Sequence, residues 1–523
     1  MMTKSVLPRV ALLVLCAAQA AVCQAGGAQF AEKQDAEKLN AALRKLDALI
    51  TETMARTRVP GLAVAVVYGD KTVFARGYGV RRLGDPAKVD ADTVFEIASV
   101  SKPIASTIVA SLVGTGEVSW NDKIAKLDPG FKLSDESATA EVTVRDLFAH
   151  RSGLPTGGGD VLEDLGYSRP EILNLLRYVP LVGPMGKTYH YSNFGLTEGA
   201  IAAVRKTGKT WEEIANERLY SRIGMTSTSS RFSDYENNPD KAALHVLWDG
   251  EYRNWFVREA DSESPAGGVS SNVRDLAKWI SLQLNGGRFG GEQVVDAKAL
   301  EETHRAQICS AVAGPVAMDQ CPGGRFYGLG WNVGKTEDGK LQLGHSGAFL
   351  LGTSTAVYMI PEEHIGVVVL VNGTPTGVPE TVCLTFLDFF RYGEAKRDYM
   401  ALAGPVFQGM WKENQDVAKD YAKLEPPKKP AAAKDLASYA GTYVSQYYGA
   451  LKIEVREGRL VMRLPPREAY YELTHWDGDT FTYYFASENT GIARRGVRFL
   501  GGGKVLVENL AQAGNDGVFT KVE

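Results

Sequence analysis

Strand-like runs stand at two distant places in this chain of 523 residues, and their separation limits the folds open to it. Leu62–Tyr68 and Lys71–Tyr78 are joined at Gly69-Asp70, which is the pattern of a tight hairpin. Further runs follow only much later, at Leu341–Leu343, Ser354–Ile360 and Ile365–Asn372. We therefore expect an α+β fold in which one antiparallel sheet, closed by distant segments, is flanked by helices.

Helical patterns lie before, between and after these strands. An amphipathic stripe predicts a helix over Ala31–Arg56, and a helical region runs from about Thr143 to Leu284. A further helix is expected over Pro379–Tyr392. These segments supply the layers that would cover the sheet.

A second unit follows Lys423–Lys434, a stretch rich in Pro, Ala and Lys that is typical of a semi-rigid linker. Short alternating segments recur between Gly441 and Glu508, separated by turns such as Glu457-Gly458. They predict a small antiparallel barrel or sheet. The tyrosines of this unit could line a ligand mouth, although we prefer to place them in the core and on the rim of the barrel. They are Tyr443, Tyr447, Tyr448, Tyr470, Tyr471, Tyr483 and Tyr484. The sequence leaves open whether this unit packs near a catalytic cleft or against a neighbouring subunit of a homo-oligomer.

The first residues resemble a secretory signal. Lys4 and Arg9 form a basic start, Val10–Ala18 an apolar core, and small residues at Ala18-Gln-Ala20 or Cys23-Gln-Ala25 a cleavage site. That apolar core is too short for a stable membrane span, so we expect an exported, periplasmic or secreted protein. The expected divisions are 1–25 as signal peptide, 26–395 as the first domain, 396–434 as connecting segment and linker, and 435–523 as the barrel domain.

The net charge argues against nucleic-acid and membrane partners, and the spacing of the cysteines and histidines argues against a zinc site. With 62 acidic and 58 basic residues the net charge is −4, which gives no reason to expect nucleic acid or an anionic membrane. Cys309 and Cys321 flank a Gly/Pro/Ala loop and could pair in an oxidising compartment. No His or Cys cluster has the spacing of zinc ligands, so neither a metal nor another cofactor is expected.

A serine and a lysine stand where an extended segment, beginning at Phe95, turns into the apolar run Ala105–Val113. Ser99 and Lys102 are three residues apart, which places them on one face of a helix. A neutral lysine amine could take the serine proton, and neutrality near pH 7 needs a pKa lowered by roughly three units, about 4 kcal/mol. A single Ser-x-x-Lys match is expected by chance in a chain of this composition, so its meaning depends on the motifs that follow.

Three motifs together carry a resemblance. Ser99-Val-Ser-Lys102, Tyr191-Ser-Asn193 and His345-Ser-Gly347 have the order and rough spacing found in the serine β-lactamase and penicillin-binding protein superfamily. The chain most resembles its class C and esterase-like branch, over about Leu39–Tyr392. The supporting stretches are Leu147–Pro155, Gly224–Thr228, Ala266–Ser271 and Tyr327–Trp331. The C-terminal unit resembles the lipocalin-like barrel often appended to this hydrolase family.

The resemblance implies roles for the first two motifs. Ser99 would be the nucleophile that forms an acyl-enzyme. Lys102 and Tyr191 would share the base role, with the lysine charge lowering the pKa of the phenol. Tyr191 would then protonate the leaving group. Asn193 would orient the Lys102 amine or a substrate amide.

It also implies roles around the third motif. The backbone N–H groups of Ser99 and Ala348 would form an oxyanion hole. His345 would line the site and contact substrate or Tyr191, and Gly347 would let the strand come close to the acyl chain. Lys206-Thr-Gly208 has the letters of an alternative third motif, but it reads as the end of a helix.

The histidine at position 345 departs from the lysine usual in the β-lactamase pattern. Because histidine is mostly neutral at pH 7, it favours an esterase or peptidase over a protein that recognises a carboxylate. We expect a serine hydrolase for small peptides, amides or esters, with D-residue peptides included by family analogy. The alternatives are a β-lactamase or D,D-carboxypeptidase, and a non-catalytic binding protein or sensor.

Overall fold

The computed structural model describes residues 35–312, 314–414, 420–464, 466–467 and 469–522. The expected signal peptide, with Cys16 and Cys23, lies outside the described residues. The first domain is built on an eight-stranded antiparallel sheet in the order β2-β1-β14-β13-β12-β11-β10-β9. Its strands are β1 Gly61–Tyr68, β2 Lys71–Gly79, β9 Ile308–Cys309, β10 Phe326–Tyr327, β11 Asn332–Lys335, β12 Leu341–Phe349, β13 Thr353–Ile360 and β14 Ile365–Val371.

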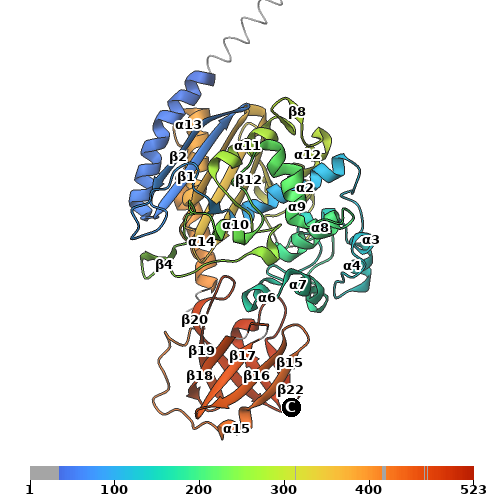
Figure 1. Cartoon of the computed structure of the whole chain (residues 1–523), viewed down its shortest axis with the longest axis vertical. Coiled ribbons are helices and arrows are strands. Elements are labelled where there is room, and N and C mark those ends of the chain that lie inside the picture. The colour runs from blue at the N-terminus through green and yellow to red at the C-terminus, as the bar shows by residue number, and fades with distance from the viewer. Residues whose placement is uncertain (1–34, 313, 415–419, 465, 468, 523) are drawn as a thin grey trace, which may run out of the picture.

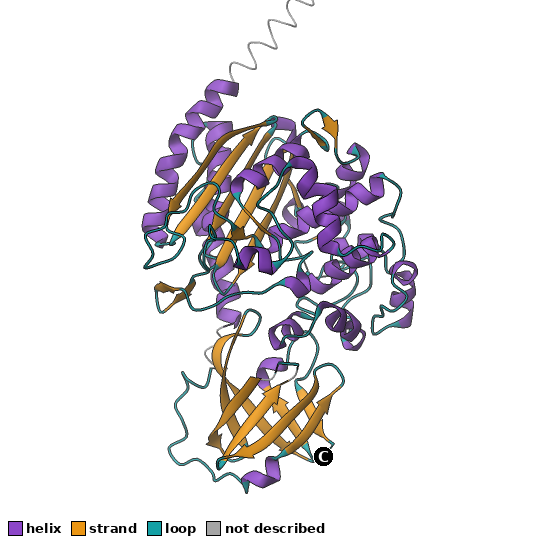
Figure 2. Cartoon of the chain, viewed as in Figure 1, coloured by secondary structure: helices purple, strands orange, loops and turns teal. Residues whose placement is uncertain are grey.

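Distant segments close this sheet, as the sequence predicted. β1 pairs with β14 from Leu62↔Val371 to Tyr68↔Ile365, so the start of the domain lies beside its end. The side chains of β1 alternate between two apolar cores: Val64 packs in the core that includes the helix of residues 35–57, and Ala65 packs in the other. Helices therefore cover both faces of the sheet, which explains why β1 and β14 are apolar throughout (Figure 2).

The helices divide between the two faces. The helix of residues 35–57 and α13 (Val378–Tyr392) share one apolar core with the sheet, while α2 (Ser101–Gly114) and α11 (Val273–Leu284) lie in the other. The remaining helices of the first domain are α3 Ile124–Leu127, α4 Glu136–Glu141, α5 Val144–Phe148, α6 Asp160–Leu165, α7 Arg169–Leu175, α8 Asn193–Arg205, α9 Trp211–Ala215, α10 Phe232–Glu236 and α12 Ala297–Thr303. Short strand pairs are β3 Phe95–Glu96 with β6 Ser270–Ser271, β4 Val246–Trp248 with β5 Glu251–Arg253, and β7 Arg288–Phe289 with β8 Glu292–Gln293.

Cys309 and Cys321 are joined by a disulfide, and Cys383 is a buried free thiol on α13. Of the helices that the structure describes, none combines the length and the apolar character needed to cross a bilayer.

A helix lies in the connecting segment, where the sequence analysis placed only a linker. α14 (Tyr399–Asn414) packs against α13, and the helix α15 (Leu436–Tyr439) then precedes the second domain. That domain is a closed antiparallel barrel (Figure 1). Its strands are β15 Gly441–Ser445, β16 Gly449–Arg456, β17 Arg459–Leu464, β18 Ala469–Asp477, β19 Thr480–Ser487, β20 Gly491–Gly501, β21 Lys504–Val507 and β22 Val518–Lys521.

The barrel packs against the first domain of its own chain, which is one of the two placements left open by the sequence. Ile492 of the barrel shares an apolar cluster with Val246 and Leu351 of the first domain. Most of the tyrosines considered for a ligand mouth are either buried or exposed on the outside: Tyr443, Tyr447, Tyr448 and Tyr483 are buried, and Tyr470 and Tyr484 are exposed. These six side chains therefore lie in the core or on the rim of the barrel.

Candidate active site

Ser99 stands on a tight turn between β3 and α2. The 3₁₀ turn Ala98–Val100 leads directly into α2, and Ala98 has a φ of 47°, in the left-handed region that costs a residue with a side chain roughly 1–2 kcal/mol. Hydrogen bonds hold this conformation: the Ile97 N–H donates to Val269 O (2.9 Å), and the Ser101 hydroxyl donates to Ala98 O (2.6 Å). The serine is thus presented on a fixed, strained turn.

The third motif lies inside β12, next to this turn. A Cβ at Gly347 would stand 2.2 Å from Ile97 O and 3.1 Å from Ser99 N, so only glycine lets the strand approach so closely. The sequence analysis expected this glycine to make room for the acyl chain, whereas the contact is with the backbone of the Ser99 turn. β11 pairs with β12 only as far as Gly344, so His345 and the residues after it extend beyond that partner.

The side chains of Lys102, one helical turn away, and Tyr191, from a distant segment, meet at the Ser99 hydroxyl. Lys102 Nζ lies 3.0 Å from Ser99 Oγ, and the Tyr191 hydroxyl donates to the same oxygen at 2.8 Å. Lys102 Nζ also donates to Asn193 Oδ1 at 2.7 Å and to Ala266 O at 2.9 Å. Of the two roles expected for Asn193, its contact is the one with the lysine amine.

The lysine is buried in a way that favours its neutral form. The Lys102 side chain has no solvent exposure, and burial lowers its pKa to about 8, opposed by the charges of Glu263 and Asp160. A neutral amine has two N–H groups and one lone pair. With its N–H groups donated to Asn193 Oδ1 and Ala266 O, the lone pair faces Ser99 Oγ and can accept the serine proton.

Tyr191 has the opposite electrostatic state from the one expected. Burial raises the pKa of its phenol well above the ordinary value, so the expectation of a phenol partly ionised by the lysine charge was wrong. Lys102 Nζ does lie 4.5 Å from the centre of the ring, but the desolvation of the phenolate outweighs that charge. In the resting site Tyr191 is therefore a neutral proton donor, and Lys102 is the group able to act as base.

His345 is fixed by two neighbours of its own. Its Nδ1 lies 2.7 Å from Ser346 O, which places the ring proton on Nδ1, and Nε2 accepts from the Tyr327 hydroxyl at 2.9 Å. Burial, with a smaller effect of Lys102, lowers the pKa of His345 to about 3, so the ring is neutral. The expected contact with Tyr191 is one between rings, 6.4 Å apart, rather than a hydrogen bond.

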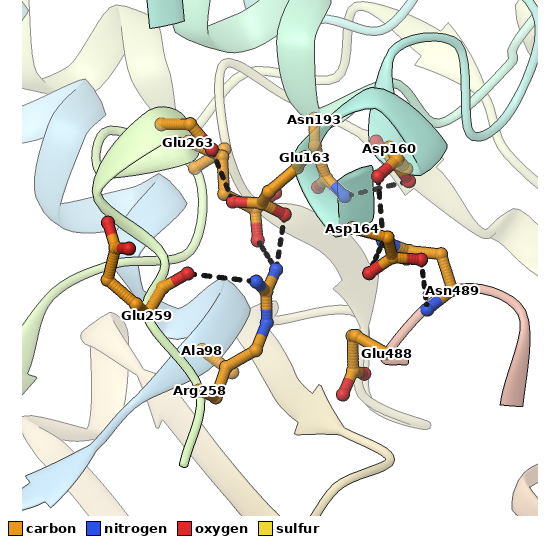
Figure 3. A network of polar contacts seen from close by, with 12 residues as sticks. Ala98, Asp160, Glu163, Asp164, Asn193, Arg258, Glu259, Glu263, Glu488 and Asn489 are labelled. Atoms are coloured by element: carbon orange, nitrogen blue, oxygen red, sulfur yellow. Dashed lines mark hydrogen bonds and ion pairs between the residues drawn. The ribbon is translucent and has the colours of Figure 1, made fainter. Parts of the chain in front are cut away.

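Three residues near the site were not assigned a role from the sequence. Tyr327 and His150 both lie in stretches that carried the resemblance; the His150 ring stands 4.5 Å from that of Tyr191 and 4.8 Å from that of Tyr327. Asp160, the first residue of α6, accepts from Asn193 Nδ2 at 3.2 Å (Figure 3). Nothing in the local sequence marked this aspartate, because its partner is distant in the chain.

Comparisons with known proteins bear on the family and the fold of the chain. A family model described as Beta-lactamase matches residues 46–388, and one described as a domain of unknown function (DUF3471) matches residues 425–502. Among similar proteins, "Unguisins hydrolase ungD" of Aspergillus violaceofuscus is 25% identical over 465 residues, covering 83% of this chain and 81% of its own. "Protein flp" of Staphylococcus aureus is 23% identical over 354 residues, 66% of each chain. The octameric penicillin-binding protein homologue from Pyrococcus abyssi shares the fold, with a TM-score of 0.57, 22% identity, and coverage of 88% of this chain and 97% of its own.

Proposed function

Since this chain belongs to the beta-lactamase family, whose model matches residues 46–388, we propose that it is a serine hydrolase that forms an acyl-enzyme at Ser99. One observation carries the proposal: the Ser99 hydroxyl lies within hydrogen-bond distance of both the Lys102 amine and the Tyr191 phenol. The buried amine supplies a base and the neutral phenol an acid, which are the two groups that acyl transfer needs.

Acylation uses the two groups in turn. As Ser99 Oγ attacks the carbonyl carbon, its proton passes to the lone pair of Lys102, and Tyr191 then gives its proton to the leaving group. The resulting phenolate faces the new Lys102 ammonium, whose Nζ lies 4.5 Å from the ring centre. Backbone N–H groups of Ser99 and Ala348 are the oxyanion donors that the family resemblance implies, where one donor contributes about 3–4 kcal/mol.

Deacylation restores the starting state. A water molecule gives a proton to the Tyr191 phenolate, and its oxygen adds to the acyl carbon. Ser99 Oγ then leaves and takes back the proton held by Lys102, so that the acid product is released and the serine hydroxyl, the neutral amine and the phenol are all regenerated.

The surroundings of His345 favour a substrate whose acyl group carries no charge. His345 is neutral and its Nε2 is occupied by Tyr327, so it offers no permanent cation to a substrate carboxylate. Small peptides, amides and esters fit this environment better than a free carboxylate. A relative named as a hydrolase, "Unguisins hydrolase ungD", supports hydrolysis as the reaction class.

We also propose that the protein is exported. The Cys309–Cys321 disulfide supports it, because such bonds persist in oxidising compartments such as the periplasm or the extracellular space. The basic and apolar pattern of the first residues supports the same destination.

A turnover screen tests the proposed function. The mature chain and its Ser99→Ala variant are compared on p-nitrophenyl esters, D- and L-aminoacyl amides and nitrocefin. We expect hydrolysis of esters or amides that the variant lacks. Preferential turnover of nitrocefin would instead identify a β-lactamase, and no turnover by the unmodified chain would leave a binding protein or sensor.

A further inference from the structure

The barrel makes hydrogen bonds at both ends of α6, the short helix that begins at Asp160. α6 contains six residues and stands between Gly159 and Gly166. Before the helix, the Gly159 N–H donates to the Tyr447 hydroxyl of the barrel at 3.0 Å. After it, the Tyr167 hydroxyl donates to Tyr448 O at 2.8 Å. Both ends of α6 are thus bonded to the same barrel segment.

A second barrel segment holds the helix along its length. Asn489 lies in the turn between β19 and β20, and its Nδ2 donates to Asp160 O at 3.0 Å and to Asp164 Oδ1 at 3.3 Å. Its backbone N–H donates to Asp164 Oδ2 at 3.1 Å (Figure 3). One asparagine therefore ties the first turn of α6 to its last.

The neighbouring Glu488 anchors this turn to the residues that follow β12. Its carboxylate accepts from the N–H groups of Leu350 (2.6 Å) and Leu351 (3.1 Å), directly after β12. Glu488 is buried, close to the ion pairs that Arg258 makes with Glu163 and Glu263. The position of Asn489 is consequently fixed from both sides.

From α6 the hydrogen bonds continue to the proposed base. Asp160 Oδ2 accepts from Asn193 Nδ2 at 3.2 Å, and Asn193 Oδ1 accepts from Lys102 Nζ at 2.7 Å. The carboxylate thereby fixes which end of the Asn193 amide faces the lysine. If the amide turned over, its NH₂ would donate to the lone pair of Lys102 and compete with Ser99 for it.

We infer that Asn489 is a positioning residue of the active site: through α6 it holds Asn193 in the orientation that leaves the Lys102 lone pair to Ser99. The inference rests on the proposed function, because it gives a barrel residue a part in the activation of Ser99. It gives the barrel a part in holding the residues around Ser99 in place.

Loosening α6 should change the proton affinity of the lysine in a known direction. The groups that face Lys102 are Glu263, Asp160, Tyr191 and, further away, His150 and His345. Burial is the largest effect on the Lys102 pKa and holds it down. Water admitted by a displaced α6 would raise that pKa, while moving Asp160 away would lower it; because burial is the largest effect and Asp160 the smallest, we expect Ser99 to react only at higher pH.

The test compares two asparagine variants of the full chain. Asn489→Ala removes the two side-chain hydrogen bonds to α6 and leaves the backbone bond to Asp164, whereas Asn509→Ala removes a bond inside the barrel, where Asn509 Oδ1 accepts from the Tyr483 hydroxyl at 2.6 Å. The rate of Ser99 labelling by a fluorophosphonate is measured from pH 6 to 10, together with Tm. We expect Asn489→Ala to lose tenfold or more at pH 7, with the pH profile moved upward. Asn509→Ala should lower Tm and keep both the rate and the profile.

A paired exchange separates positioning from a general loss of packing. Asn489→Asp alone sets a carboxyl against Asp164 and should slow labelling, while adding Asp164→Asn restores an amide–carboxyl pair and should recover part of the rate. Equal rates and profiles for Asn489→Ala and Asn509→Ala would overturn the inference and leave the proposed function intact. An unmodified chain that never reacts at Ser99 would instead overturn the proposed function itself.

Discussion

At the residue scale, the chemistry depends on which group beside Ser99 is able to accept a proton. Burial acts in opposite directions on the two candidates, because it always disfavours the charged form. It lowers the pKa of Lys102 to about 8 and raises that of the Tyr191 phenol well above its ordinary value. At neutral pH a fraction of the lysine is already the free amine, while the phenol keeps its proton.

The pH dependence of Ser99 acylation should follow the lysine. Below about pH 8 Lys102 is increasingly an ammonium that cannot accept a proton, so the rate should fall tenfold per pH unit toward acid and level off above pH 8. Labelling of Ser99 by a fluorophosphonate, followed from pH 5 to 10, measures this directly. A midpoint near pH 6 would point to a histidine and contradict the assignment.

Tyr191→Phe tests the proposed acid. The ring can keep its contacts with His150 and Tyr327, while the hydroxyl that donates to Ser99 is lost. We expect kcat to fall by roughly 10²–10⁴ with little change in Tm. Tyr220→Phe is the matched control, since it removes another buried phenol hydroxyl, bonded to Ser230. Equal activity in the two variants would exclude Tyr191 as the acid.

The sequence was most informative at this scale where a motif is local. Ser99 and Lys102 share one helical turn, and the structure places them within hydrogen-bond distance as expected. Asp160 and Asn489 gave no signal, because each acquires its partner only when segments more than 30 and 300 residues apart come together. The pKa of Tyr191 was mispredicted because a pattern of residues does not reveal burial.

At the scale of elements, the site is made by β12 passing close to the Ser99 turn. The Thr355 hydroxyl of the neighbouring strand β13 donates to Ile97 O at 2.7 Å, so two strands hold the backbone before the serine. A side chain at Gly347 would meet the same two groups, Ile97 O and Thr355 Oγ1. Strand packing and the strained conformation of the turn are therefore coupled.

Gly347→Ala should damage both stability and activity. The added methyl would lie 2.2 Å from Ile97 O, which forces the strand and the turn apart at a cost of roughly 1–3 kcal/mol. Gly334→Ala on β11 is the control, because a Cβ there meets nothing within 4 Å. We expect only the first variant to lose Tm and Ser99 labelling, as measured by calorimetry and labelling rate. Similar behaviour of the two glycine variants would contradict the proposed packing.

Helix α8, which begins at Asn193, carries a buried carboxyl at Glu198. Neither of its oxygens has a hydrogen-bond partner among the described residues, and burial raises its pKa well above the ordinary value. The unfolded chain releases this proton above about pH 4.5, while the folded chain retains it. The group therefore costs stability that grows as pH rises.

Glu198→Gln should remove that pH-dependent cost. Compared with the unmodified chain, the variant should be more stable at pH 8, and the difference should shrink as pH falls toward 4.5, with a slope of at most about 1.4 kcal/mol per pH unit. Urea unfolding at several pH values provides the measurement. A difference that grows toward acid pH would contradict the assignment of Glu198 as a buried neutral acid.

Elements were predictable where their periodicity was long. The strands β1, β2, β13 and β14 and helix α13 match the expected ranges closely, since each carries an extended pattern, whereas only the first residues of β12 were expected. The short strands β9, β10 and β11 were not expected either, and two further elements were missed for identifiable physical reasons. α14 contains Pro405, which reads as a break, and β22 has only four residues and gains its stability from pairing with β15 and β21.

At the scale of the whole molecule, the two domains behave as one packed unit. Their contact combines the apolar cluster around Ile492 with the hydrogen bonds of Tyr447, Glu488 and Asn489. The linker, by contrast, is exposed at Lys428 and Lys429. The resemblance to an appended barrel indicated the second domain, but not the surface on which it docks.

Cutting the linker should therefore not separate the domains. A specific protease site placed at Pro427–Lys429 would break the chain in an exposed stretch, while the interface remains buried. We expect the cleaved protein to elute as one species and to keep its rate of Ser99 labelling. Cleavage combined with Glu488→Ala and Asn489→Ala should release the barrel; separation without these substitutions would show that the interface is weaker than its contacts indicate.

Activation of Ser99 by Lys102 is the step on which the proposed function depends, and mass spectrometry can test it in one experiment. The unmodified chain and its Lys102→Ala variant are treated with a fluorophosphonate at pH 8 and mapped by peptide analysis. We predict one phosphonyl adduct, on the peptide that contains Ser99, in the unmodified chain and none in the variant. An adduct on another residue, or equal labelling of Ser99 without Lys102, would contradict the account.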